Sequence, residues 1–375
     1  MAAGPVLALP NVTAEVVASG LAWPVTFAFA PDGRIYFSEL ATGRVRSLVG
    51  GQVEPGELFN VTVLTNGEQG LLGIALDPDN GTWPNVNVFA YHTYLNSTLA
   101  RPMNRVVRYV GDAVNPRLEV LLDGIPAGTF HNGGILGIAP DWTLFITTGD
   151  ATDPANSQDN GTLAGKVLRI NRDGSIPGDN PIPGSPVYSL GHRNVFGLAF
   201  HPLTGMAYVS ENGPSQDDEV NLLEPGRNYG WPLVTGDADD ARFVDPVVTF
   251  RRVIAPTGLA FYVGSAVPSW RDDLFLGDWS RGTLQRIDLA PPDFRVAVGN
   301  ESLISVGPGG VLDVEMGPDG DLYFSTTNAI LRARATLEDG VPALEPGLLF
   351  VLVAVSATVG ALFIVVLLHR RQRPL

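Results

Sequence analysis

The stretch FAPDGRIYFSE at residues 29–39 contains an apolar residue, a proline-containing turn and a short run typical of a β-strand. Pro-Asp-Gly favours a tight turn because proline fixes its own φ and glycine tolerates a positive φ. One copy of this pattern predicts only a hairpin. Five further segments repeat it: LDPDNGTWPNVNVFAYH (76–92), IAPDWTLFITTGD (138–150), FHPLTGMAYVSE (200–211), VPSWRDDLFLGD (267–278) and MGPDGDLYFST (316–326).

The six copies recur at similar intervals. Their turn prolines are 47 to 66 residues apart, at Pro31, Pro78, Pro140, Pro202, Pro268 and Pro318. Such an interval holds four short strands and their loops. Six repeats fit an array of small sheets or a propeller, and a propeller also protects the strand edges. No segment before residue 346 has sustained helical periodicity. The sequence therefore predicts an all-β, six-bladed β-propeller over residues 1–335, with its functional loops at the central axis.

The composition excludes several kinds of chemistry. Among 375 residues, 39 are acidic and 24 are Lys or Arg, and the net charge of −15 argues against nucleic acid as a partner. The absence of cysteine excludes thiolate catalysis, cysteine-ligated zinc and disulfide bonds. The 43 glycines and 30 prolines, spread over the whole chain, indicate many tight turns. These features are typical of a turn-rich β protein.

The C-terminal residues have a different composition. Residues 347–368 read GLLFVLVAVSATVGALFIVVLL, which has no charged side chain and is long enough to cross a bilayer as a helix. A predicted linker at 336–346 precedes this segment, and a basic tail at 369–375 follows it. By the positive-inside rule, we expect a single-pass protein of the cell membrane with an extracellular propeller and a cytoplasmic C-terminus.

Six Asn-X-Ser/Thr triplets are consistent with an exported glycoprotein. They begin at Asn11, Asn60, Asn80, Asn96, Asn160 and Asn300. Residues 1–10 do not read as a signal peptide, because they lack a charged start and their apolar stretch is short. The export route is therefore left open.

Several loop segments occur together in a fixed order over about residues 15–330. They are NGEQGLLGIALDPD (66–79), FHNGGILGIAPDWTLFITTGD (130–150), SQDNGTLAGKVLRINRDGSIPGDNP (157–181), YSLGHRNVFGLAFHP (188–202), ENGPSQDDEVNLLEPGRNYGWP (211–232) and APTGLAFY (255–262). This set resembles the glucose/sorbosone dehydrogenase family, the soluble aldose sugar dehydrogenases that use pyrroloquinoline quinone (PQQ). The resemblance implies oxidation of the C1 hydroxyl of a sugar to a lactone, with hydride passing to PQQ.

The resemblance also implies roles for individual residues. His131, in HNGG, matches the family's general base, a role that suits a neutral imidazole because its pKa lies near the operating pH. Arg193 and Asn194, in GHRN, match positions that polarise the quinone oxygens and hold the substrate. Gln69, in GEQG, matches a further polar contact to the cofactor.

A calcium site is implied in the segment that follows. Gly213 and Pro214 match the pair whose backbone carbonyls bind the Ca²⁺ that bridges to PQQ. Asp218 and Glu219 supply carboxylates nearby, and hard oxygen donors are the ligands that Ca²⁺ prefers.

The positions expected to hold the three PQQ carboxylates depart from the family pattern. Anionic groups removed from water need paired cations, and the family uses one lysine and two arginines. Here the matching positions read Ser280, Gly310 and Leu312. Three further family positions, an aromatic, an aspartate and an arginine, read Arg251, Phe130 and Ile135.

Replacement contacts to the cofactor are predicted from three arginines. Arg251 and Arg281, together with Arg252, supply replacement charge if their side chains turn toward the axis.

Four tryptophans are expected in the core between blades: Trp142, Trp231, Trp270 and Trp279.

The sequence thus favours a membrane-anchored, extracellular, PQQ- and Ca²⁺-dependent aldose dehydrogenase with a small sugar as substrate. It does not identify the electron acceptor. The alternative is a non-catalytic propeller ectodomain that binds a glycan or a protein and has lost the PQQ-carboxylate contacts. A Ca²⁺-dependent lactonase is a third possibility, but it needs converging carboxylates at the axis, and the sequence shows no sufficient set.

Overall fold

A computed structural model describes residues 11–79, 85–307 and 310–336, which form six antiparallel sheets and two short 3-10 helices. The strands are β1 (Asn11–Ser19), β2 (Phe27–Phe29), β3 (Ile35–Glu39), β4 (Arg44–Val49), β5 (Gln52–Val53), β6 (Phe59–Asn60), β7 (Leu71–Leu76), β8 (Val88–Asn96), β9 (Arg101–Val110), β10 (Arg117–Pro126), β11 (Gly133–Ile138), β12 (Leu144–Thr148), β13 (Lys166–Ile170), β14 (Val187–Leu190), β15 (Val195–Phe200), β16 (Ala207–Glu211), β17 (Asp218–Leu222), β18 (Val248–Phe250), β19 (Pro256–Phe261), β20 (Leu274–Asp278), β21 (Thr283–Leu289), β22 (Ala297–Ser305), β23 (Asp313–Met316), β24 (Leu322–Ser325) and β25 (Ala329–Thr336). The helices are η1 (Pro154–Gln158) and η2 (Pro268–Trp270).

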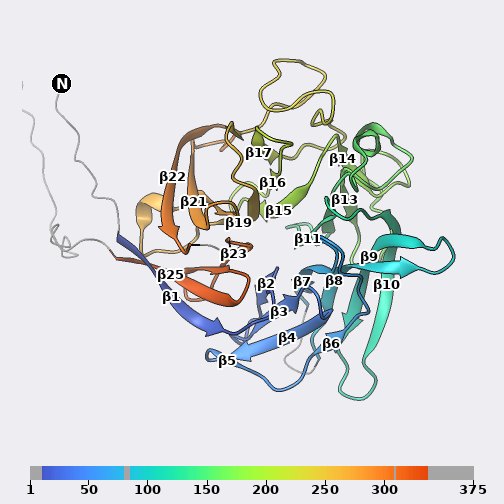
Figure 1. Cartoon of the computed structure of the whole chain (residues 1–375). Helices are drawn as coiled ribbons and strands as arrows, with labels where there is room; N and C mark the ends of the chain where they lie inside the picture. Colours follow the sequence, from blue (N-terminus) through green and yellow to red (C-terminus); the bar gives the residue numbers. More distant parts are fainter. Residues whose placement is uncertain (1–10, 80–84, 308–309, 337–375) are drawn as a thin grey trace, which may run out of the picture. The chain divides into compact units, whose positions relative to one another are not determined.

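Each sheet is one blade of a ring (Figure 1). The innermost strands are β2, β7, β11, β15, β19 and β23, and each contacts the innermost strands of the two neighbouring blades. The N-terminal strand β1 pairs with β25, from Asn11 opposite Thr336 to Ser19 opposite Ala329. This pairing completes the last blade with a strand from the start of the chain and so closes the ring. The predicted six-bladed, all-β propeller is confirmed.

The repeated proline turns join the two innermost strands of a blade. In the first blade, Gly33 donates its N–H to Ala30 O at 2.9 Å and adopts a φ of 82°. In the last blade, Gly320 donates to Gly317 O at 3.0 Å with a φ of 84°. The third blade makes the same turn with Trp142 at the left-handed position, at a φ of 70°. The turn therefore requires a positive φ at this position. Glycine supplies it in the first and last blades, and Trp142 supplies it in the third.

The hydrophobic core lies between neighbouring blades. Between the third and fourth blades, for example, Ile135 packs in one cluster with Val195 and Val209. Trp270 is buried between the last two blades, as predicted. The same prediction is wrong for the other three tryptophans: Trp142 and Trp279 are 48% and 36% exposed, and Trp231 is half-buried. They lie at turns and loops rather than in strands.

In the ranges that the structure describes, no helix is long and apolar enough to cross a membrane. The predicted membrane span 347–368 and tail 369–375 lie outside those ranges, as does the predicted linker apart from Thr336. The membrane anchor therefore stays a prediction from the sequence.

Candidate functional site

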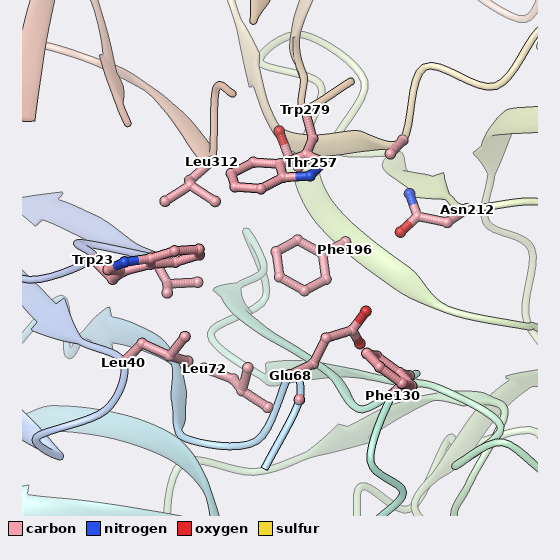
Figure 2. A pocket seen from close by; sticks show the side chains of 13 residues that line it. Trp23, Leu40, Glu68, Leu72, Phe130, Phe196, Asn212, Thr257, Trp279 and Leu312 are labelled. Carbon is pink, nitrogen blue, oxygen red and sulfur yellow. The ribbon is translucent and has the colours of Figure 1, made fainter. Parts of the chain in front are cut away.

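A cavity of about 320 Å³, which we call the axial cavity, opens where the innermost strands begin. It is lined by residues that precede or start those strands and by residues that follow the second strands of the blades. The lining residues are Trp23, Val25, Leu40, Gly67, Glu68, Leu72, Phe130, Phe196, Asn212, Ala255, Thr257, Trp279 and Leu312 (Figure 2).

The lining is mainly apolar and aromatic. The rings of Trp23 and Trp279 lie 5.8 Å apart and are tilted by 40°. Figure 2 shows the Phe196 ring between these two tryptophans and the side chains of Glu68 and Phe130. Glu68 is the one ionisable side chain among the lining residues that the structure describes.

His131 lies in the loop before β11 and is fixed by an acid. Its Nδ1 is 2.8 Å from Oδ1 of Asp150, and the other oxygen of Asp150 accepts a hydrogen bond from Trp231 Nε1 at 2.9 Å. Asp150 is fully buried, whereas the His131 side chain is 19% exposed. A carboxylate on Nδ1 favours the tautomer whose lone pair is on Nε2. Within the described part of the chain Nε2 has no hydrogen-bond partner, so His131 has the arrangement of a general base.

Glu68 connects His131 to the axial cavity. Its Oε2 accepts the backbone N–H of His131 at 2.7 Å. Burial raises the pKa of Glu68, against the lowering effects of this N–H and of the charge on Arg193. The main chain of His131 is held in the left-handed region, at a φ of 58°, by this contact and by the bond from Ala151 N–H to His131 O at 3.0 Å. The loop geometry is therefore set by tertiary contacts.

Arg193 lies in the loop before β15 and is half-buried. Its Nη1 donates to the carbonyls of Asn212 at 2.9 Å and Gly213 at 2.8 Å, and its guanidinium lies over the Trp231 ring at 5.4 Å. Burial lowers the pKa of Arg193, and the charges of nearby carboxylates, led by Asp150, oppose this effect. Arg193 therefore joins the loops around His131 and is already surrounded by acids.

Two predicted cofactor contacts, Gln69 and Asn194, do not line the axial cavity. Gln69 is buried, and its Nε2 donates to Gly128 O at 2.9 Å. Asn194 is buried, and its Oδ1 accepts the N–H of Gly133 at 3.1 Å. Both side chains hold the His131 loop in place. Asn212, which lines the cavity, was not among the predicted contacts.

The residues predicted to bind Ca²⁺ are largely engaged in other hydrogen bonds. Asp218 accepts three backbone N–H groups, from Gly213 at 2.7 Å, Ile254 at 2.6 Å and Ala255 at 2.8 Å. Glu219 accepts from the Gly236 N–H and from Asn221 Nδ2. Asp218 thus acts as a clamp on the loop before β19, and the Gly213 carbonyl already accepts from Arg193.

No cluster of three or more acidic or histidine side chains suited to a metal ion occurs among the described residues. Pro214 is exposed and lines a minor cavity with Glu219. The described acidic side chains therefore form no metal site of their own, and Ca²⁺ binding by the Gly213 and Pro214 carbonyls stays a prediction.

The arginines predicted to replace the missing charges lie away from the axial cavity. Arg251 is exposed and borders a separate surface pocket that includes Asp217 and Thr249. Arg281 is 42% exposed, and its Nη1 lies 3.8 Å from Asp278. Arg252 is exposed as well. None of the three lines the cavity, so the structure does not bring them to a cofactor there.

The residues present do not fit the three carboxylates of PQQ. In the part of the chain that the structure describes, no lysine or arginine lines the axial cavity. Leu312 and Phe130 line it instead, and Gly310 packs directly against the ring of Trp279. A trianion placed there would lose its hydration without gaining paired cations, beside the acid Glu68. PQQ is therefore not assigned a place in this cavity.

Sequence reasoning missed Asp150 and Glu68. Asp150 ends the quoted segment IAPDWTLFITTGD, and the turn at Pro140 makes that segment a hairpin. In the hairpin Gly133 pairs with Thr148, and His131 and Asp150 each lie two residues beyond this pair. Counting outward from the turn brings Asp150 within one residue of His131 and could have identified the pair.

Comparison with known proteins places this chain in a family. The Glucose / Sorbosone dehydrogenase family model matches residues 21–332. The quinoprotein glucose dehydrogenase B of Acinetobacter calcoaceticus is 35% identical over 62% of this chain and 55% of its own length. The aldose sugar dehydrogenase YliI of Escherichia coli K12 is 28% identical over 84% of this chain and 90% of its own.

A solved structure agrees with these relatives. The PQQ-bound aldose sugar dehydrogenase of Streptomyces coelicolor superposes with a TM-score of 0.75 at 32% identity, over 87% of this chain and 99% of that one. Its fold and the fold of this chain are the same six-bladed propeller. The chain belongs to the glucose/sorbosone dehydrogenase family of oxidoreductases.

Proposed function

We propose that this chain is an aldose dehydrogenase that oxidises the C1 hydroxyl of a sugar to a lactone, with His131 as the general base. The observation that carries this proposal is the 2.8 Å contact between His131 Nδ1 and Asp150, which leaves Nε2 free to accept a proton. Family membership supports the choice of a sugar as substrate.

Side chains of this protein can accept the proton that leaves the sugar hydroxyl. The sugar O1–H donates to His131 Nε2, and the buried carboxylate of Asp150 balances the charge that then forms on the imidazole. Arg193 keeps the loops of Asn212 and Gly213 beside this base. The C1 hydrogen leaves as hydride, so the reaction needs an electron acceptor close to His131. We assign that acceptor to the axial cavity because Glu68, which lines it, also accepts the backbone N–H of His131.

The cellular setting of the enzyme is proposed from the sequence. The uncharged segment 347–368 and its basic tail support a single-pass anchor in the cell membrane, with the propeller outside and the C-terminus inside. The six Asn-X-Ser/Thr triplets also support an extracellular location of the propeller. The PQQ that the family resemblance implies is not supported by the lining of the cavity, and Ca²⁺ stays a prediction from the resemblance.

The test is sugar-dependent reduction of an artificial acceptor by the purified full chain. A panel of aldoses is offered with a redox dye, with and without added PQQ and Ca²⁺. We expect reduction with at least one aldose, and loss of it in His131→Ala at an unchanged thermal unfolding midpoint. If no aldose reduces any acceptor in either condition, the dehydrogenase is excluded in favour of a non-catalytic propeller.

A further inference from the structure

We propose that the axial cavity binds an uncharged, flat quinone ring in place of the tricarboxylate PQQ, and that this ring accepts the hydride. The proposal that the ring binds is argued from the residues that line the cavity. The acceptor part rests on the proposed function.

The walls of the cavity suit a flat apolar ring. Trp23 and Trp279 present two indole rings 5.8 Å apart, and Phe196 and Phe130 add two further aromatic faces. A flat ring can stack in an offset or tilted arrangement on the cavity-facing sides of such side chains. The volume of about 320 Å³ is enough for a ring system of one or two fused rings.

The tryptophan at the centre of this wall has its place set by a glycine. A Cβ atom at Gly310 would lie 2.1 Å from the Trp279 ring, and Gly310 has a φ of 65°. Any larger side chain at 310 would push the indole out of the cavity wall. The aromatic wall therefore occupies space beside the position where the family pattern calls for a cation.

The charges of the cavity favour a neutral ligand. Glu68 is the ionisable side chain of the described lining, and no cation of that lining opposes it. An anion would have to shed its hydration next to an acid, whereas an uncharged ring has no such cost. Burial raises the pKa of Glu68, so its carboxyl takes up a proton more readily than an exposed glutamate does.

The Asn212 side chain offers an amide donor to a carbonyl oxygen of the quinone. The Asn212 amide has two N–H groups, and one of them donates to Pro256 O at 2.8 Å. The other has no partner among the residues that the structure describes. Asn212 lines the cavity and lies to the right of Phe196 in Figure 2, so it can hold one quinone oxygen.

The redox step balances with such a ligand. The C1–H bond breaks and its electron pair passes with the hydrogen to the quinone, while the O1–H bond breaks and its proton passes to His131. A C1=O bond forms in the sugar product. The reduced ring then takes the proton from His131 to become the hydroquinone, so two electrons and two protons are transferred.

The test measures binding without any sugar, through quenching of tryptophan fluorescence in the full chain. The probes are 1,4-naphthoquinone and 1,4-naphthoquinone-2-sulfonate, which share a ring system and differ by one negative charge, together with PQQ. The chain has no cysteine, so thiol adducts with quinones do not arise. We expect the uncharged ring to quench saturably and the sulfonate to bind about tenfold or more weakly. Equal or tighter binding of the sulfonate or of PQQ overturns the proposal.

Two pairs of variants locate the ligand. Trp23→Ala should weaken naphthoquinone about tenfold. Trp142→Ala should leave it unchanged, although Trp142 has a similar exposure, 48% against 44%, and a similar positive φ, 70° against 55°. Phe130→Arg should favour the sulfonate, and Leu203→Arg, at an exposed position away from the cavity, should not. Equal effects within either pair contradict the assignment.

Activity separates this proposal from the proposed function. If naphthoquinone binds as described but no aldose reduces any acceptor, the cavity assignment stands and the proposed function fails. If aldoses reduce a dye but naphthoquinone neither binds nor is reduced, the proposed function stands and this inference fails. If naphthoquinone binds but only the dye is reduced, the acceptor part is wrong.

Discussion

The carboxylate of Asp150 joins the imidazole of His131 to the indole of Trp231. One oxygen lies 2.8 Å from His131 Nδ1, and the other accepts from Trp231 Nε1 at 2.9 Å. Asp150 also accepts the N–H of Thr152 at 2.8 Å. All of these contacts hold the acid in one orientation, and the acid in turn fixes the tautomer of the base.

Asp150→Asn should abolish most of the sugar-dependent activity. An amide can offer its N–H to His131 Nδ1, and this places the ring proton on Nε2, where the base needs a lone pair. We expect kcat to fall by roughly two to four orders of magnitude with little change in the thermal unfolding midpoint. The check is steady-state kinetics at saturating acceptor. A kcat within about threefold of the parent would show that Asp150 does not set the tautomer.

Asn132→Ala should damage both the stability and the site. The Asn132 side chain is buried, accepts from Gly128 N–H and Asn104 Nδ2 at 3.1 Å each, and donates to Gly128 O at 3.0 Å. Its loss leaves the buried N–H of Gly128 without that partner, and we expect a cost of about 2–4 kcal/mol in the free energy of unfolding. Urea denaturation of the parent and the variant measures this difference in the free energy of unfolding.

The exposed Asn160→Ala is the control for that variant. It should change the free energy of unfolding by less than about 0.5 kcal/mol. Equal stabilities of the two variants would mean that the Asn132 network does not support the His131 loop.

Stability should fall as the pH rises from about 5 to 8, because of two acids on β23. Burial raises the pKa of Asp313 to about 7, and burial together with Asp313 raises the pKa of Glu315 well above its ordinary value. The folded state therefore holds protons that the unfolded chain releases at lower pH. The stabilisation is complete below the unfolded pKa values and is lost as the pH passes the folded ones.

Glu315→Gln tests the origin of that dependence. The amide cannot ionise, so we expect a higher unfolding midpoint than the parent at pH 8 and a smaller difference at pH 5. Glu54→Gln is the matched control, because Glu54 is 47% exposed. A parent midpoint that rises between pH 5 and pH 8, or parallel curves for parent and Glu315→Gln, would contradict this account.

The fold could be predicted from the sequence because each blade repeats the same turn pattern. Pro31-Asp32-Gly33 and Pro318-Asp319-Gly320 form the same turn in the structure, and each turn joins the two innermost strands of its blade. The resemblance also singled out His131, whose Nδ1 lies 2.8 Å from Asp150 in the structure, and its role as general base stays a prediction. Local patterns of this kind depend on near neighbours in the chain, so they can be read without a structure.

The walls of the site could not be predicted in the same way. Trp279 was expected in the core, but it follows the short strand β20 and lies over Gly310 at the cavity. Glu68 and Gln69 are adjacent in the loop before β7, and their tertiary contacts decide that Glu68 lines the cavity while Gln69 binds Gly128. Both outcomes depend on contacts between segments far apart in the sequence.

The central claim is that His131 removes a sugar proton while hydride leaves C1. The most direct measurement compares the rate of acceptor reduction with a C1-deuterated aldose and with the ordinary aldose, in the parent and in His131→Ala. The account predicts a slower rate with the deuterated sugar in the parent and no sugar-dependent rate in the variant. Equal rates for both sugars at saturating acceptor, with the activity kept in His131→Ala, would contradict it.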